Sequence, residues 1–245
     1  MAEFSMKIAG CVGAITSLFG STPQYFRPYL TEEPPHFSYT VRWDDIAFEK
    51  NFLYEEALAE GFRVRSFPDP YLERAAIQRS FAEHLFHRST LLFHGSAVAV
   101  DGKAYLFTAK SGTGKSTHTR LWREAFGPRA QMVNDDKPFL HITDSGIFAC
   151  GAPWSGKHGL DSNITVPLAG ICILVRGQEN RIRPITPEDA FPMLLKQSNP
   201  PMDTALLPRF EALVHTLSRS VPLWHMECTR DPEAAQVSYR AMKRK

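Results

Sequence analysis

The 245-residue sequence contains little cysteine, and the few cysteines have no pattern. Cys11, Cys150, Cys172 and Cys228 lie far apart, with no C-x-x-C pair and no Cys/His spacing of a metal ligand set. This arrangement excludes a zinc finger and a disulfide framework. The expected compartment is therefore the reducing cytoplasm.

Charge of one sign and long hydrophobic runs are also lacking. Lysine and arginine number 28 against 26 aspartates and glutamates, a formal net charge of +2, which is too small to indicate nucleic acid or a membrane surface as a partner. The longest apolar run, residues 168–175, has the length of a buried strand and not of a membrane span. With 43% hydrophobic residues the chain can bury a substantial core, so we expect a soluble protein.

Residues 1–68 are expected to form a small α+β region without a catalytic or binding motif. Their pattern predicts a short strand at residues 5–13, an alternating strand at residues 36–43 and a mixed helix near residues 49–60. A second domain, residues 69–245, is expected to open with a helix, because apolar residues follow two prolines at helical spacing.

The pair Asp101-Gly102 stands between two β-rich runs and predicts a hairpin. If these residues form the turn, Val100 pairs with Lys103 and the register puts His94 opposite Ala109. His94 would then lie beside the loop that follows the hairpin. A histidine that is simply hydrogen-bonded at a strand end is the alternative.

The stretch AKSGTGKSTHT, residues 109–119, matches a phosphate-binding loop between an apolar strand and an amphipathic helix. Backbone N–H groups of such a loop and of the helix start bind phosphate oxygens. Lys115 would add a positive charge at the β- and γ-phosphates, and Ser116 would offer a hydroxyl to Mg²⁺. Ala109 stands where the strict pattern has glycine. The predicted nucleotide contacts are Ser111, Gly112, Thr113, Gly114, Lys115, Ser116 and Thr117.

Asp135 and Asp136 follow a short apolar segment, residues 130–133. If that segment and residues 104–109 are parallel strands joined by a right-handed crossover, their carboxyl ends meet at one sheet edge, beside the loop. One carboxylate would then hold Mg²⁺ and the other would accept the proton of an attacking hydroxyl. We take Asp135 as the base and Asp136, with Ser116, as the metal ligands, and the reverse assignment stays open. A plain turn is the alternative, since NDDKP is rich in turn formers.

The last candidate segment is GAPWSGKHG, residues 151–159. Trp154 offers a flat face, Ser155 a hydrogen-bonding group and Lys157 a mobile charge, so the three are candidate substrate contacts. The segment fits a simple turn equally well.

In this order, HGS (residues 94–96), SGTGKST (111–117), NDD (134–136) and GAPWSGK (151–157) resemble the HPr kinase/phosphorylase family. The likeness covers residues 91–245 and is closer to short relatives described as HPr-kinase-like or phosphoenolpyruvate-carboxykinase-like. It implies an α/β fold with a P-loop kinase core, its mixed sheet flanked by helices. It also implies that His94 and Asp135 act on an acceptor hydroxyl, with Mg²⁺ held by Ser116 and Asp136. The glycine-rich signature that contacts HPr in that family is not recognisable here.

The sequence therefore predicts a Mg²⁺-dependent kinase that transfers the γ-phosphoryl group of ATP to a serine-like hydroxyl of a small molecule or peptide. Lys115, His94 and Asp135 would be its catalytic residues. A nucleotide-binding regulatory module without transfer, and a peptide-serine kinase of a peptide-tailoring pathway, are the alternatives. ATP is taken as the donor, with GTP and pyrophosphate left open, as is a homo-oligomeric state. The absence of N-K-x-D and L-S-G-G-Q sequences disfavours a GTPase switch and an ABC-type ATPase.

Overall fold

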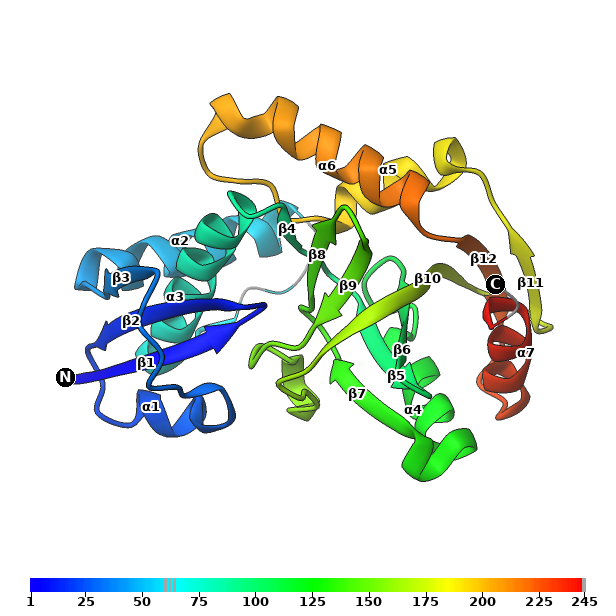
Figure 1. Cartoon of the computed structure of the whole chain (residues 1–245), viewed down its shortest axis with the longest axis horizontal. Coiled ribbons are helices and arrows are strands. Elements are labelled where there is room, and N and C mark those ends of the chain that lie inside the picture. The colour runs from blue at the N-terminus through cyan, green and yellow to red at the C-terminus, as the bar shows by residue number, and fades with distance from the viewer. Residues whose placement is uncertain (60, 62, 64, 244–245) are drawn as a thin grey trace. The chain divides into compact units, whose positions relative to one another are not determined.

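The computed structural model describes residues 1–59, 61, 63 and 65–243. The chain divides into two compact units, Met1–Leu85 and Phe86–Lys245. Figure 1 labels their helices and strands. Residue 60, the expected end of the first predicted helix, lies outside the described residues.

The first unit is a three-stranded sheet with two long helices. Its strand order is β1-β2-β3, with β1 antiparallel and β3 parallel to β2. The elements are β1 (Ala2–Ile8), β2 (Cys11–Ser17), α1 (Thr22–Tyr25), η1 (Arg27–Tyr29), β3 (Phe37–Thr40), α2 (Trp43–Ala59) and α3 (Asp69–Phe86). The single strand expected at residues 5–13 is wrong, because Ala9 and Gly10 take positive φ angles of 49° and 74° and turn the chain into a hairpin.

Helix α3 belongs to the first unit up to Leu85, although the sequence placed it at the start of the second domain. Phe81 on α3 packs edge-to-face on Phe37 of β3, with ring centroids 5.0 Å apart. The buried Glu73 accepts a hydrogen bond from Leu18 N at 2.5 Å. Its other carboxylate oxygen accepts one from the Thr22 hydroxyl. These contacts attach the helix to the β1–β3 sheet, which sequence periodicity alone does not reveal.

The second unit is built on a nine-stranded mixed sheet flanked by helices. Its strands follow the order β4-β8-β9-β10-β6-β5-β7, and β12 pairs with both β10 and β11. The strands are β4 (Thr90–Leu92), β5 (Ser96–Val100), β6 (Lys103–Thr108), β7 (Ala130–Asn134), β8 (Phe139–Thr143), β9 (Gly146–Cys150), β10 (Thr165–Arg176), β11 (Arg181–Pro184) and β12 (Leu223–Cys228). The helices are α4 (Lys115–Phe126), η2 (Gly127–Arg129), η3 (Gly156–His158), α5 (Pro187–Gln197), η4 (Thr204–Leu206), α6 (Leu207–Ser220) and α7 (Glu233–Met242).

Helices cover both faces of the central strands. Because side chains alternate along a strand, Leu106 of β6 packs in one cluster with Leu194 of α5 and Val214 of α6. The next residue, Phe107, packs in another with Trp122 of α4 and Tyr239 of α7 (Figure 1). The sheet is therefore the middle layer of a mixed α/β unit.

The predicted hairpin at Asp101-Gly102 is confirmed. β5 and β6 pair antiparallel with Val100 opposite Lys103. Asp101 and Gly102 have φ angles of 52° and 77°, the positive values that a type I′ turn requires.

The order β6-β5-β7 positions the site. β5 is antiparallel to both neighbours, so β6 and β7 run parallel to each other with β5 between them. α4 makes the crossover from β6 to β7. The sequence predicts this direction but not the intervening strand. The carboxyl ends of β6 and β7 consequently lie at the same edge of the sheet.

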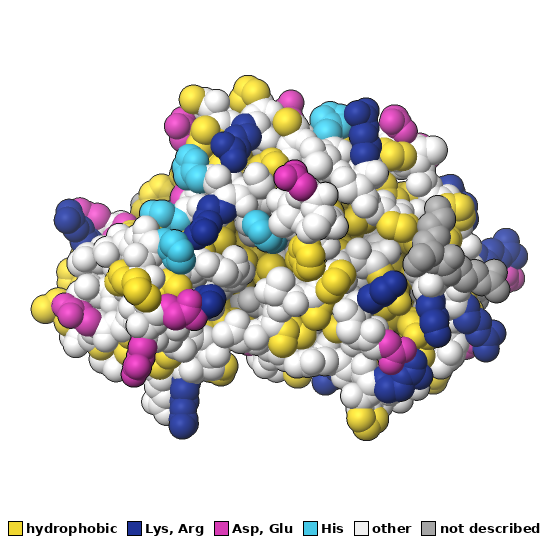
Figure 2. All heavy atoms as spheres, viewed as in Figure 1, with side chains coloured by type: hydrophobic (Ala, Val, Ile, Leu, Met, Phe, Trp, Pro, Cys, Tyr) yellow, Lys and Arg dark blue, Asp and Glu magenta, His cyan; other side chains and the backbone are white. Residues whose placement is uncertain are grey.

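The surface visible in Figure 2 carries both signs of charge, with hydrophobic side chains scattered among them. This distribution agrees with the small net charge of +2. Within the described ranges, no helix combines the length and the apolar character needed to cross a bilayer.

Candidate active site

The loop between β6 and α4 has the backbone conformation that glycine makes accessible. Gly112 and Gly114 take φ angles of +74° and +124°, values that L side chains rarely adopt. Lys115 opens α4, is 9% exposed, and its Nζ donates to Ala109 O at 3.4 Å across the loop. Ala109 is fully buried in the core and is not among the positive-φ residues, so a glycine is not required there.

Asp135 lies at the end of β7 and turns toward the first turns of α4. The carboxylate oxygen Oδ1 accepts a hydrogen bond from Ser96 Oγ at 2.7 Å and one from Thr119 Oγ1 at 3.5 Å. The Thr119 hydroxyl also lies 3.3 Å from the carbonyl oxygen of Ser116. Asp135 is only 5% exposed. The Thr119 hydroxyl thus lies within hydrogen-bonding distance of both this carboxylate and the first turn of the helix that follows the loop.

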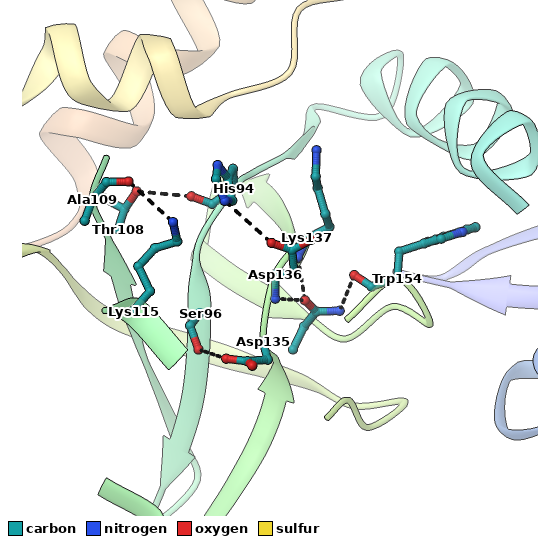
Figure 3. A network of polar contacts seen from close by, with 10 residues as sticks. His94, Ser96, Thr108, Ala109, Lys115, Asp135, Asp136, Lys137 and Trp154 are labelled. Carbon is teal, nitrogen blue, oxygen red and sulfur yellow. Dashed lines mark hydrogen bonds and ion pairs between the residues drawn. The ribbon is translucent and has the colours of Figure 1, made fainter. Parts of the chain in front are cut away.

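Asp136 points to a different group, as Figure 3 shows. Its Oδ1 lies 3.5 Å from His94 Nε2, and its side chain is 36% exposed. Burial raises the pKa of Asp136 above its ordinary value, against the opposing charges of Lys137 and Lys115, and the charge of Asp135 adds to the rise. The two adjacent aspartates therefore have separate environments.

His94 lies beside the loop in surroundings that favour the neutral imidazole. Burial lowers its pKa to about 3, and the charges of Lys115 and Lys137 act in the same direction, while a hydrogen bond with the Gln197 side chain opposes them. The backbone is fixed on both sides, since His94 N donates to Gln197 O at 2.7 Å and Thr108 Oγ1 donates to His94 O at 3.1 Å. The contact with Thr108 places His94 at the end of β6, where the hairpin register predicted it.

Asn134 organises the acidic turn, and sequence reasoning gave it no role of its own. It is fully buried, and its Oδ1 accepts hydrogen bonds from the N–H groups of Asp136 and Lys137 at 2.8 and 2.6 Å. Its Nδ2 donates to Ala152 O at 2.6 Å and to Trp154 O at 3.3 Å. The sequence does contain a signal for this role. In an Asx turn the side chain of an asparagine accepts a hydrogen bond from the backbone N–H two residues later, and Asn134 precedes Asp136 by two residues.

The segment after β9 packs its backbone against the acidic turn. Trp154 and Ser155 are 8% and 2% exposed, and Ser155 Oγ donates to Asp161 Oδ2 at 2.5 Å. A Cβ on Gly156 would stand 3.2 Å from the Cβ of Asp136. Lys157, in η3, is exposed. Of the three candidate substrate contacts, Lys157 is therefore the one with a side chain on the surface.

A magnesium site here would have few protein ligands. In the part of the chain that the structure describes, no three His, Cys, Asp or Glu side chains are grouped to hold a metal ion by themselves. Mg²⁺ on a nucleotide is usually held by one or two carboxylates together with phosphate oxygens and water. A serine hydroxyl and a carboxylate are oxygen ligands of the kind that this ion accepts.

No family model matches the sequence, and no curated protein matches it. Among solved structures, the chain is similar to the Hpr(Ser) kinase/phosphatase from Coxiella burnetii with a TM-score of 0.39 and 13% identity, over 63% of this chain and 99% of that chain. A similarity of this size carries no inference about activity.

Proposed function

We propose that the chain is a Mg²⁺-dependent kinase that transfers the γ-phosphoryl group of ATP to a hydroxyl group of a small molecule or peptide. The observation that carries the proposal is the convergence, at one sheet edge, of the glycine-containing loop after β6 and the acidic pair after β7. Phosphoryl transfer depends mainly on positioning and charge neutralisation, and these groups can supply both.

The donor side is formed by the loop and α4. The N–H groups of the loop and of the helix start would bind phosphate oxygens, together with the Lys115 ammonium group. When bound, ATP would supply the γ-phosphoryl group, leaving ADP as the acceptor oxygen attaches to phosphorus, and Mg²⁺ would neutralise phosphate charge. We assign the metal side to Ser116 and Asp135, because the Thr119 hydroxyl lies beside both the Asp135 carboxylate and the backbone carbonyl of Ser116. Asp135 is therefore the aspartate next to the first turns of α4.

The acceptor side is formed by Asp136 and His94. We assign the base to Asp136 in place of Asp135, because Asp136 is partly exposed whereas Asp135 is enclosed by Ser96 and Thr119. A carboxylate with a raised pKa accepts a proton more readily. Asp136 would take the proton from the acceptor hydroxyl, and the neutral His94 would orient the carboxylate without neutralising it.

Matched Asp→Asn variants at the two positions test this division of roles. Binding of ATP with Mg²⁺ would be measured by titration calorimetry, and transfer with γ-labelled ATP against a panel of hydroxyl acceptors that includes serine peptides. Asp136→Asn should retain ATP affinity within about twofold and lose transfer by roughly 100-fold or more, the usual contribution of a general base. Asp135→Asn should weaken the binding of ATP specifically when Mg²⁺ is present.

The outcomes separate the alternatives. Transfer at the wild-type rate by Asp136→Asn removes this residue from the base role. Wild-type protein that binds ATP tightly but transfers phosphate neither to a hydroxyl nor to water would be a nucleotide-binding regulatory module and not a kinase.

A further inference from the structure

Arg176 stands level with the phosphate loop, at the end of the strand next to β6. β10 runs parallel to β6 with Ile173 opposite Thr108, so Arg176 follows the end of the paired region by three residues. Its Nη2 donates to Gly112 O at 2.5 Å, and its Nε donates to Thr113 O at 3.5 Å. One guanidinium group thus contacts two consecutive carbonyls of the loop.

These contacts bear on the direction of the loop N–H groups. In a trans peptide the C=O and the following N–H point in opposite directions. When Arg176 holds the carbonyls of Gly112 and Thr113, the N–H groups of Thr113 and Gly114 are turned away from it. Thr113 N then donates within the loop, to Lys110 O at 3.2 Å. The Thr113 N–H would have to exchange this carbonyl for a phosphate oxygen. The arginine thus fixes the planes of two peptide groups whose N–H groups lie on the side away from the guanidinium, which leaves that side open to an anion.

The loop needs such a restraint because its glycines are conformationally free. Gly112 and Gly114 adopt positive φ in the structure but have access to many other conformations. A site that must order flexible residues on binding loses affinity, and prior ordering restores it. An arginine suits this role, since its planar fork is always charged and can donate to two acceptors at once.

We propose that Arg176 is a positioning residue of the phosphate loop, which it holds in the anion-binding conformation through the carbonyls of Gly112 and Thr113. The proposal rests on the kinase function assigned above. It predicts an effect that acts through the phosphates of the donor and does not depend on the base or on the acceptor.

The test compares Arg176→Gln and Arg176→Lys with the control Arg181→Gln. Arg181 is a suitable control because its exposed guanidinium pairs with the nearby Glu179. Affinities for ATP with Mg²⁺ and for inorganic tripolyphosphate would be measured by titration calorimetry, with the melting temperature of each free protein as a check on folding.

Arg176→Gln should bind both ligands about tenfold more weakly, the effect of removing charged hydrogen bonds that orient the site. Arg176→Lys should recover part of this loss, because an ammonium group can donate to one of the two carbonyls. Arg181→Gln should bind both ligands like the wild type. If the Arg176→Gln substitution lowers the affinity for ATP and for tripolyphosphate by the same factor, the arginine acts on phosphate binding.

Three results would overturn the proposal, and they are distinguishable. If the wild type binds both ligands and Arg176→Gln binds them equally well, Arg176 has no positioning role while the kinase proposal stands. If the wild type binds neither ligand, both proposals fail. If Arg176→Gln has a lower melting temperature and Arg176→Lys does not restore it, the substitution has a general effect on folding. This result also counts against a positioning role for Arg176.

Discussion

Replacing Asn134 by alanine should loosen the acidic turn and destabilise the second unit. The side chain is fully buried and makes four hydrogen bonds, to Asp136 N, Lys137 N, Ala152 O and Trp154 O. A buried group left without its partner costs about 1–3 kcal/mol. Water can reach the partly exposed turn, so we expect the free energy of unfolding to fall by about 3 kcal/mol and not by the sum of four losses.

Urea denaturation followed by tryptophan fluorescence measures this change. A Trp43→Phe background removes the tryptophan of the first unit and leaves those of the second, Trp122, Trp154 and Trp224. For a urea m-value of about 2 kcal/mol per M, Asn134→Ala should lower the midpoint by roughly 1.5 M. Asn180→Ala is the matched control, because Asn180 Oδ1 accepts from Thr229 N at 3.0 Å in another turn of the same unit; its cost should be about 1 kcal/mol.

A loss below about 0.5 kcal/mol for Asn134→Ala, or a loss no larger than that of the control, would refute the reasoning. The same variant should reduce phosphate transfer more than ATP affinity, since it displaces the turn that carries Asp136 and leaves the loop after β6 in place. Equal losses in transfer and in ATP affinity would mean that the turn and the loop form one structural element.

Two further predictions concern pH. Burial raises the pKa of Asp136, and a proposed base must be deprotonated to act, so transfer should fall as the pH drops through that raised pKa. The acid limb of the pH–rate profile should therefore lie above the range of an ordinary aspartate. A limb at or below that range would exclude Asp136 as its source. Burial lowers the pKa of His118 to about 4. Between about pH 6.5 and pH 4 the unfolded state therefore binds more protons than the folded state. As the pH falls through this interval, the free energy of unfolding should decrease by on the order of 3 kcal/mol. The free energy of unfolding measured across this interval should show a slope that is smaller in His118→Gln, and an unchanged slope would contradict the assignment.

Short sequence motifs predict those parts of the site whose conformation depends on residues adjacent in the chain. The Asp101-Gly102 turn set the register of β5 and β6, and the position of His94 followed from it. The glycines and Lys115 gave the loop after β6, because positive φ and a helix start are properties of a short segment.

Long-range pairing accounts for what the sequence did not show. That β5 lies between β6 and β7 is a consequence of strand pairing, which no short segment encodes. The divergent directions of Asp135 and Asp136 depend on Ser96 and His94, about forty residues earlier in the chain. The contact between Arg176 and Gly112 spans 64 residues, and an exposed arginine at a strand end has no local signal for such a partner. Similarly, α3 has a clear helical pattern, but only its packing on β3 shows to which unit it belongs.

The order β6-β5-β7 has a consequence for how the chain acquires its shape during synthesis. The hairpin, the loop, α4 and β7 follow one another without interruption between residues 96 and 136, and contacts that are close in sequence form fastest. The loop and both aspartates can therefore come together on the nascent chain before β10 has left the ribosome. This part of the candidate site would then exist before the rest of the sheet, and the arrival of β10 with Arg176 at its end would complete it.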